Sequence, residues 1–83
     1  MTLRLLYFAR LRERFGVGEE TLACAGTTVA ALLDTLRARG GVWAEELAPG
    51  RSFRVAVNQD LATPDTPLAE AAEVAIFPPV TGG

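Results

Sequence analysis

The chain has 83 residues, of which 49% are hydrophobic, and a formal net charge of −2. This length suits one domain and is too short for two. The acidic balance argues against a nucleic-acid partner, which requires a basic face. With no histidine and a single cysteine, the chain cannot hold a histidine-based catalytic or zinc site, a thiolate metal cluster or an internal disulfide. Without a membrane-spanning run or a signal-peptide pattern, a cytoplasmic protein is expected.

The first elements are a strand, a short helical turn and a second strand. Residues 2–9 place apolar side chains on both faces, which is typical of a central strand. In residues 10–15, Leu11 and Phe15 are four apart, and a glycine follows, so a helical turn is predicted there. Residues 19–25 form the next strand, and the cysteine in it is expected to be a small buried residue.

The main helix is predicted directly after this second strand. Thr27 or Thr28 can cap the N–H groups of its first turn. Arg37 and Arg39 are expected in the last turn, where positive charge suits the helix dipole, and Gly40-Gly41 ends the helix. One apolar stripe at spacings of three and four residues is expected to pack on the core: Val29, Leu32, Leu33 and Leu36.

The second half of the chain contains short strands and turns. Residues 42–47 predict another helical turn, and residues 53–57 a strand whose odd-numbered side chains point inward and even-numbered ones outward. A turn at 58–60 leads to a short return strand at 61–63, and the final strand covers 74–77. The first and last strands are the most apolar and are therefore expected side by side in the middle of the sheet.

These elements predict an α+β fold, a ubiquitin-like β-grasp with a mixed sheet of four to five strands and one main helix packed on one face. We assign residues 1–77 to this domain and residues 78–83 to an extended C-terminal tail.

The tail begins where the final strand meets two prolines. Pro78 and Pro79 lack an N–H group and have a fixed φ, so they end the strand and keep the chain extended. The six residues after Phe77 span about 20 Å when extended. Gly82 and Gly83 carry no side chain and would fit a channel too narrow for other residues. The pattern favours a tail inserted into a partner's pocket, although a frayed terminus is the common alternative.

Four segments together resemble the small subunits of molybdopterin synthase, the MoaD-like sulfur carriers. They are residues 6–13, 57–60, 66–68 and, most specifically, 73–83, which ends Phe-Pro-Pro-Val-Thr-Gly-Gly. One departure is Ala71-Ala72, where the family often has Gly-Asp. Because alanine tolerates a positive φ poorly, this turn is expected to be built differently.

The resemblance implies a sulfur-carrying cycle in which this chain is no enzyme on its own. A MoeB-like enzyme would use ATP to adenylate the Gly83 carboxylate, and a sulfur donor protein would convert it to a thiocarboxylate. The tail, with Val80, Thr81 and Gly82, would then enter a MoaE-like large subunit, in a heterotetramer of two small and two large subunits. The sulfur would pass to a cyclic pyranopterin precursor in molybdenum cofactor biosynthesis. No permanently bound cofactor or metal is implied.

The resemblance also implies a docking patch on the sheet face opposite the helix. Its expected members are Phe8 and Leu61, on strands next to the final strand, and Phe77, just before the tail. Two other functions remain open. One is sulfur carriage for another pathway, such as thiamin, cysteine or tRNA thiolation. The other is a β-grasp binding module without covalent chemistry, because a fold alone does not determine a function.

Overall fold

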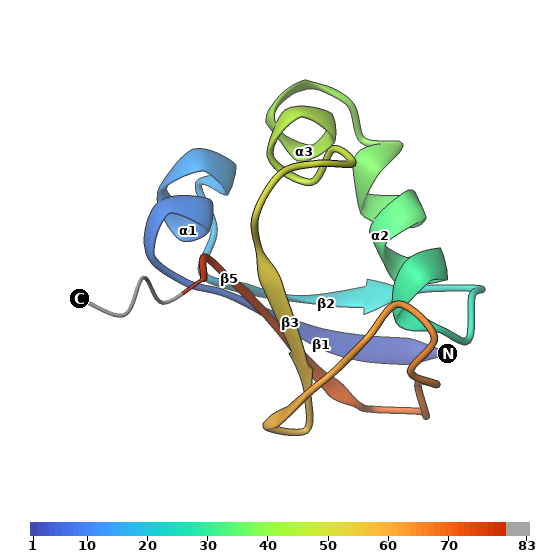
Figure 1. Cartoon of the computed structure of the whole chain (residues 1–83). Helices are drawn as coiled ribbons and strands as arrows, with labels where there is room; N and C mark the ends of the chain where they lie inside the picture. Colours follow the sequence, from blue (N-terminus) through green and yellow to red (C-terminus); the bar gives the residue numbers. More distant parts are fainter. Residues whose placement is uncertain (80–83) are drawn as a thin grey trace.

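The computed structural model describes residues 1–79, which form one mixed sheet with helices on one side (Figure 1). The strand order across the sheet is β2-β1-β5-β3-β4. The predicted β-grasp fold is confirmed. In chain order the elements are β1 (Thr2–Tyr7), α1 (Ala9–Phe15), β2 (Glu19–Ala23), α2 (Val29–Arg37), α3 (Gly41–Glu46), β3 (Arg54–Val57), β4 (Asp60–Leu61) and β5 (Glu73–Phe77).

The first and last strands lie side by side, as the sequence predicts. β1 and β5 pair in parallel, with Leu5 opposite Val74 and Tyr7 opposite Ile76. β5 pairs on its other edge with β3 in the antiparallel direction, so it occupies the middle of the sheet. All four of these side chains have at most 1% of their surface exposed. The strand that leads into the tail is therefore held from both sides by strands and from one face by the core.

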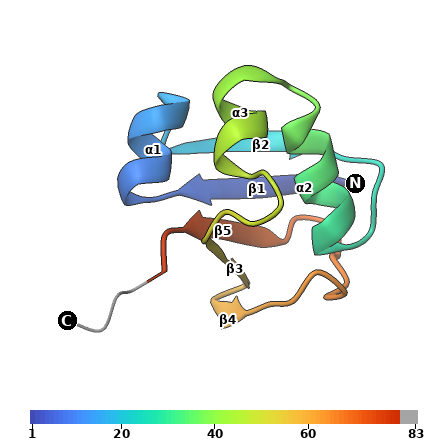
Figure 2. The ribbon, with the colours of Figure 1, turned by 45° about the horizontal axis from the view of Figure 1, so that its top comes forward.

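The helices cover one face of this sheet, and Figure 2 shows α1, α2 and α3 together in front of it. Thr28 caps α2, since its hydroxyl accepts a hydrogen bond from the Ala31 N–H at 3.2 Å. Cys24 is buried at the edge of the core, as predicted. Burying one large aliphatic side chain stabilises a fold by about 1.5–3 kcal/mol. The predicted stripe of α2 is fully inside the core: Val29, Leu32, Leu33 and Leu36.

The end of α2 differs from the prediction. The helix ends at Arg37, and Gly40, with a φ of +74°, turns the chain into α3. Arg39 therefore lies beyond the last turn, where it pairs with the Glu20 carboxylate instead of the helix dipole. A glycine tolerates this positive φ because it has no Cβ atom.

Ala56 is buried although it points away from the core. Val55 belongs to the core cluster, and Ala56 alternates to the opposite face of β3. Only 8% of its surface is exposed, because Ala75 and Leu61 flank it on the two neighbouring strands. The prediction that this side chain points away from the core is confirmed, and the neighbouring strands cover it because it is so small.

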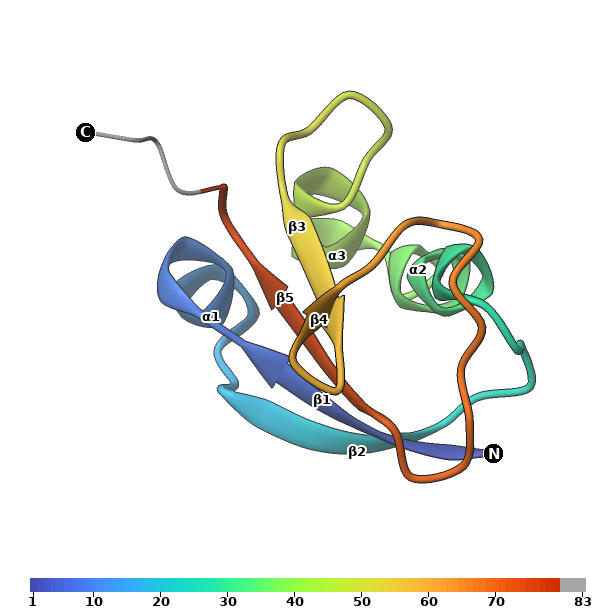
Figure 3. The same ribbon diagram turned by 60° about the horizontal axis from the view of Figure 1, so that its bottom comes forward.

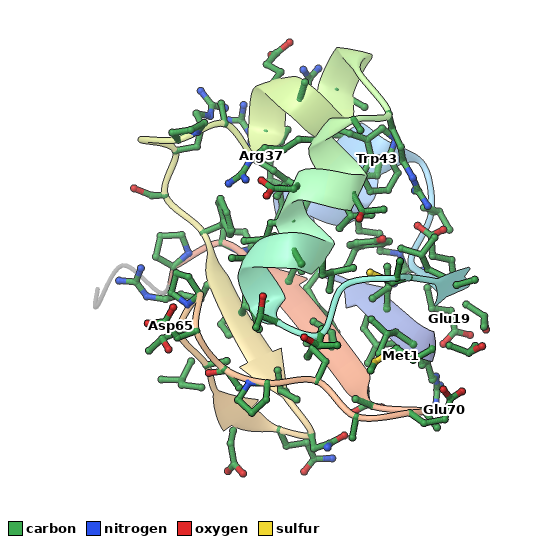
Figure 4. All side chains as sticks on the ribbon, turned by 90° about the vertical axis from the view of Figure 1, so that its right-hand side faces the viewer. Met1, Glu19, Arg37, Trp43, Asp65 and Glu70 are labelled. Atoms are coloured by element: carbon green, nitrogen blue, oxygen red, sulfur yellow. The ribbon has the colours of Figure 1, made fainter. Side chains whose placement is uncertain are left out.

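Two turns near β5 contain residues with a positive φ. Asn58 and Gln59, at φ +50° and +74°, join β3 to β4 in the hairpin visible in Figure 3. Ala71 has a φ of +64°, so the turn before β5 keeps a left-handed residue despite the alanine. Its N–H donates to the Thr2 carbonyl at 2.8 Å, and Glu70 beside it lies near the start of β1 (Figure 4). Ala71 thus adopts the positive φ that an alanine tolerates poorly.

Within residues 1–79, no helix combines the length and the apolar character that crossing a membrane requires.

Candidate tail base and docking face

The described part of the chain ends where the predicted tail begins. Phe77 is the last residue of β5 and pairs with Arg54 of β3, while the Phe8 N–H donates to the Ile76 carbonyl at 3.3 Å. Pro78 follows and is half-buried. The predicted tail residues Val80, Thr81, Gly82 and Gly83 lie outside the described residues. Pro78 and Pro79, where the predicted tail begins, directly follow the central strand of the sheet.

The sheet face opposite the helices carries a row of apolar side chains in register across four strands. Leu6 of β1 lies opposite Ala75 of β5, Ala75 opposite Ala56 of β3, and Ala56 opposite Leu61 of β4. Each of these residues alternates with side chains that point into the core. The two alanines in the middle of the row have small side chains, which project little from the sheet. Leu61 at the end of the row projects further, and 75% of its surface is exposed.

Two aromatic residues extend this row towards the tail. Phe8 is 46% exposed and Phe77 is half-buried. Phe8 is the N-cap of α1, and Ala9 after it has a φ of +51°, which turns the chain away from the sheet. Of the residues on this face, Phe8 and Leu61 are exposed, whereas the others are half-buried or buried. We call the six residues together the apolar face: Leu6, Phe8, Ala56, Leu61, Ala75 and Phe77.

The predicted positions of two interface residues need correction. Leu61 lies on β4, an edge strand that pairs with β3 and not with β5. Phe8 lies just after β1 and not within it. Strand order depends on long-range pairing, which the residue pattern of a two-residue strand cannot show. Phe8, Leu61 and Phe77 nevertheless share one face by their alternation, and their role in binding stays a prediction.

A cluster of arginines around one buried glutamate lies on the other side of the tail base. The Glu46 side chain, 3% exposed, accepts two hydrogen bonds from Arg10 at 3.2 Å, one from Arg14 at 3.1 Å and one from Arg51 at 3.3 Å. These bonds, those of Arg10 above all, lower the pKa of Glu46 to about 2 although burial opposes the shift. Sequence analysis missed the cluster, because Arg10 and Glu46 are 36 residues apart.

A second polar network lies at the same end of the sheet, under the helices. The Tyr7 hydroxyl donates to Glu20 at 2.6 Å, and Arg39 donates twice to the same carboxylate at 2.8 and 2.9 Å. The Arg39 guanidinium lies 4.4 Å from the ring centre of Trp43, which stacks on Phe15. Arg39 chiefly lowers the pKa of Glu20, and burial followed by the Glu20 hydrogen bond raises the pKa of Tyr7. These contacts join β1, which contains Tyr7, to β2 through Glu20, and they join α3 to α1 through the stacked rings of Trp43 and Phe15.

The described residues offer a surface and a rigid exit for the tail. Among residues 1–79 there is no group of three or more side chains that could hold a metal ion. The buried ionisable groups are engaged in structural ion pairs, such as that of Glu46 with its arginines.

Comparison with known proteins identifies the family. The ThiS family matches residues 5–83, nearly the whole chain.

The chain belongs to the ThiS family.

One relative is the molybdopterin synthase sulfur carrier subunit of Escherichia coli, 42% identical over 98% of this chain and 99% of that protein. The crystal structure of SAMP1 from Haloferax volcanii superposes with a TM-score of 0.83 at 27% identity, and covers all of both chains. A complex of subunits 1 and 2 of molybdopterin-converting factor from Helicobacter pylori contains a chain of the same fold. That chain superposes at a TM-score of 0.70 and 21% identity, with full coverage of both chains.

Proposed function

We propose that this chain is the sulfur-carrier small subunit of a molybdopterin synthase and that the carboxylate of Gly83 carries the sulfur. The observation that carries the proposal is the 42% identity, over 98% of the chain, to a molybdopterin synthase sulfur carrier subunit. The central strand that runs into Pro78 and Pro79 supports it, since it gives the tail a rigid origin.

The chemistry starts at a carboxylate that is a poor electrophile. An adenylating enzyme joins it to the α-phosphate of ATP and releases pyrophosphate, which turns the carboxylate into an acyl adenylate with a good leaving group. Sulfide-level sulfur released by the donor attacks the acyl carbon, the new C–S bond forms as the C–O bond to AMP breaks, and AMP leaves behind a thiocarboxylate. The thiocarboxylate sulfur is then the nucleophile towards the pyranopterin precursor. ATP is thus used by the activating enzyme, and this chain needs no resident cofactor.

The partners follow from this cycle. A large subunit receives the tail, in line with the Helicobacter pylori complex that joins subunits 1 and 2. A MoeB-like enzyme and a sulfur donor protein load the tail, and the synthase is a heterotetramer of two small and two large subunits in the cytoplasm. The apolar face is the surface on which the large subunit docks, because its exposed aromatic and aliphatic side chains lie next to the base of the tail.

The test is intact-mass spectrometry after incubation with the adenylating enzyme, ATP and a sulfur source. The wild-type chain should gain the mass difference of sulfur for oxygen at its C-terminal peptide. A variant with one residue added after Gly83 should not react, since its glycine carbonyl is already an amide. Deletion of Gly83 should fail because it shortens the reach by about 3.5 Å, and Gly82→Val because its side chain blocks a narrow channel.

Ala69→Ser, at an exposed site distant from the tail, is the matched control and should react like the wild type. Thiolation of the extended variant, or failure of the wild type, would overturn the carrier function and leave a non-covalent binding module. Copurification of a large-subunit homologue separates molybdopterin synthesis from sulfur carriage in another pathway.

A further inference from the structure

A groove of about 340 Å³ lies beside the base of the tail, on the helical side of the molecule. Pro78 forms part of its wall, so the groove and the apolar face flank the start of the tail from two sides. The remaining wall comes from α1, from the end of α3 and from the loop before β3. Its main lining residues are Arg10, Leu11, Glu46, Arg51, Ser52 and Pro78.

This groove is positively charged in a chain that is negative overall. Its lining contains two arginines, Arg10 and Arg51, and one glutamate, Glu46, which leaves one net positive charge, whereas the whole chain carries −2. The Arg10 side chain is 62% exposed and that of Arg51 is 44% exposed. The charge is therefore accessible from solvent at the mouth of the groove.

Most of the N–H donors of the cluster have no partner within residues 1–79. Each guanidinium has five N–H donors. Arg51 uses one hydrogen bond towards Glu46, and Arg10 uses two. The carboxylate of Glu46 also accepts hydrogen bonds from Arg10 and Arg14, so Arg51 is not its only partner. The buried carboxylate holds the guanidinium groups in place, which reduces the entropy that they lose when they bind an anion.

We propose that this arginine groove binds an acidic segment of the large subunit, with one or two carboxylates, at the point where the tail enters that subunit. The inference rests on the proposed function, because it needs a partner that receives the tail. A protein that surrounds the tail must cover both of its sides, and the groove forms the side opposite the apolar face. Guanidinium groups pair with carboxylates in two-point geometry, so the contact also sets the orientation of the complex.

The test compares association rates with the purified cognate large subunit at low and high salt. Ser52→Glu places a negative charge at the groove, keeps every side chain of the arginine–Glu46 cluster and should slow association about two- to fivefold at low salt. Arg51→Gln, which removes one hydrogen bond of 3.3 Å, should act in the same direction. Both effects should shrink at high salt because ions screen exposed charges.

Ala69→Glu is the matched control, since it adds the same charge at an exposed site away from the groove. Its association rate should stay close to that of the wild type, and thermal unfolding should show that all three variants are folded. If Ser52→Glu associates as fast as Ala69→Glu, the groove does not bind the large subunit and the proposal falls. If rates are equal but inorganic phosphate shifts the NMR signals of the Arg51 side chain, the groove binds small anions and protein docking is again refuted.

The same measurements separate this inference from the proposed function. Suppose that the wild-type chain becomes thiolated and binds the large subunit, but Ser52→Glu associates as fast as Ala69→Glu. That result refutes the arginine site alone. A wild-type chain that never binds the large subunit refutes both, and the thiolation assay then shows whether the carrier chemistry survives.

Discussion

Ala71 offers a direct test of backbone strain in the turn before β5. Its φ of +64° lies in the left-handed region, which costs an L-residue roughly 1–2 kcal/mol. Glycine adopts this conformation freely but loses more backbone entropy on folding, about 0.5–1 kcal/mol relative to alanine. Ala71→Gly should therefore stabilise the fold by about 0.5–1 kcal/mol. The side chain is exposed, so its removal leaves no cavity, and the hydrogen bond to the Thr2 carbonyl is retained.

Thermal and urea unfolding of the purified variant measure this difference. In a domain of this size each kcal/mol shifts Tm by about 4–8 °C, so Ala71→Gly should melt about 2–8 °C higher. The control is Ala69→Gly, two residues away, which is exposed and has no positive φ. At position 69 no backbone strain is relieved, so glycine only increases the backbone entropy that is lost on folding. The Ala69→Gly variant should therefore be less stable than the wild type. Two variants that both lose stability would refute the argument from strain.

Three further predictions concern the core, acid stability and docking. Leu33→Ala should cost about 2–5 kcal/mol in urea unfolding, because Leu33 is 6% exposed on the core side of α2; a loss under 0.5 kcal/mol would place the helix in solvent. The pKa of Glu46 is lowered to about 2 from 4.5, so the stabilisation by its ion pairs is complete above about pH 4.5 and is lost as the pH falls from there towards 2. The loss should be about 1–3 kcal/mol in urea unfolding, at the lower end because the arginines are exposed, and Glu46→Gln should flatten the profile in that window. Phe77→Ala should weaken binding to the large subunit about tenfold or more in a calorimetric titration while circular dichroism stays unchanged; an unfolded variant would place Phe77 in the core.

Local patterns in the sequence are sufficient for much of the fold. Three features depend on neighbouring residues alone. They are the spacing of three and four residues in the apolar stripe of α2, the Thr28 hydroxyl that caps this helix, and the apolar runs that form β1 and β5. The pairing of β1 with β5 also follows from sequence, since two strands that are apolar on both faces are best buried in the middle of a sheet. The same reasoning indicates the tail, because two prolines after a buried strand have an unambiguous effect on the backbone.

Contacts between distant segments decided the rest of the candidate site. Leu61 joins the apolar face through β3, although its own strand is too short to reveal its neighbour. Ala56 is buried because other strands flank it, which its alternation cannot show.

By itself, then, the sequence determined the elements and the central strand pair and predicts the tail, since each follows from the covalent order of nearby residues. Only the tertiary structure decided which side chains surround the base of that tail. Arg10, Glu46 and Arg51 come from three different segments, and the charge of each segment looks like ordinary surface charge. Folding brings the three together beside Pro78, and burial of the one carboxylate orients the guanidinium groups around it. Such a site depends on distances in space, which the order of residues along the chain does not contain.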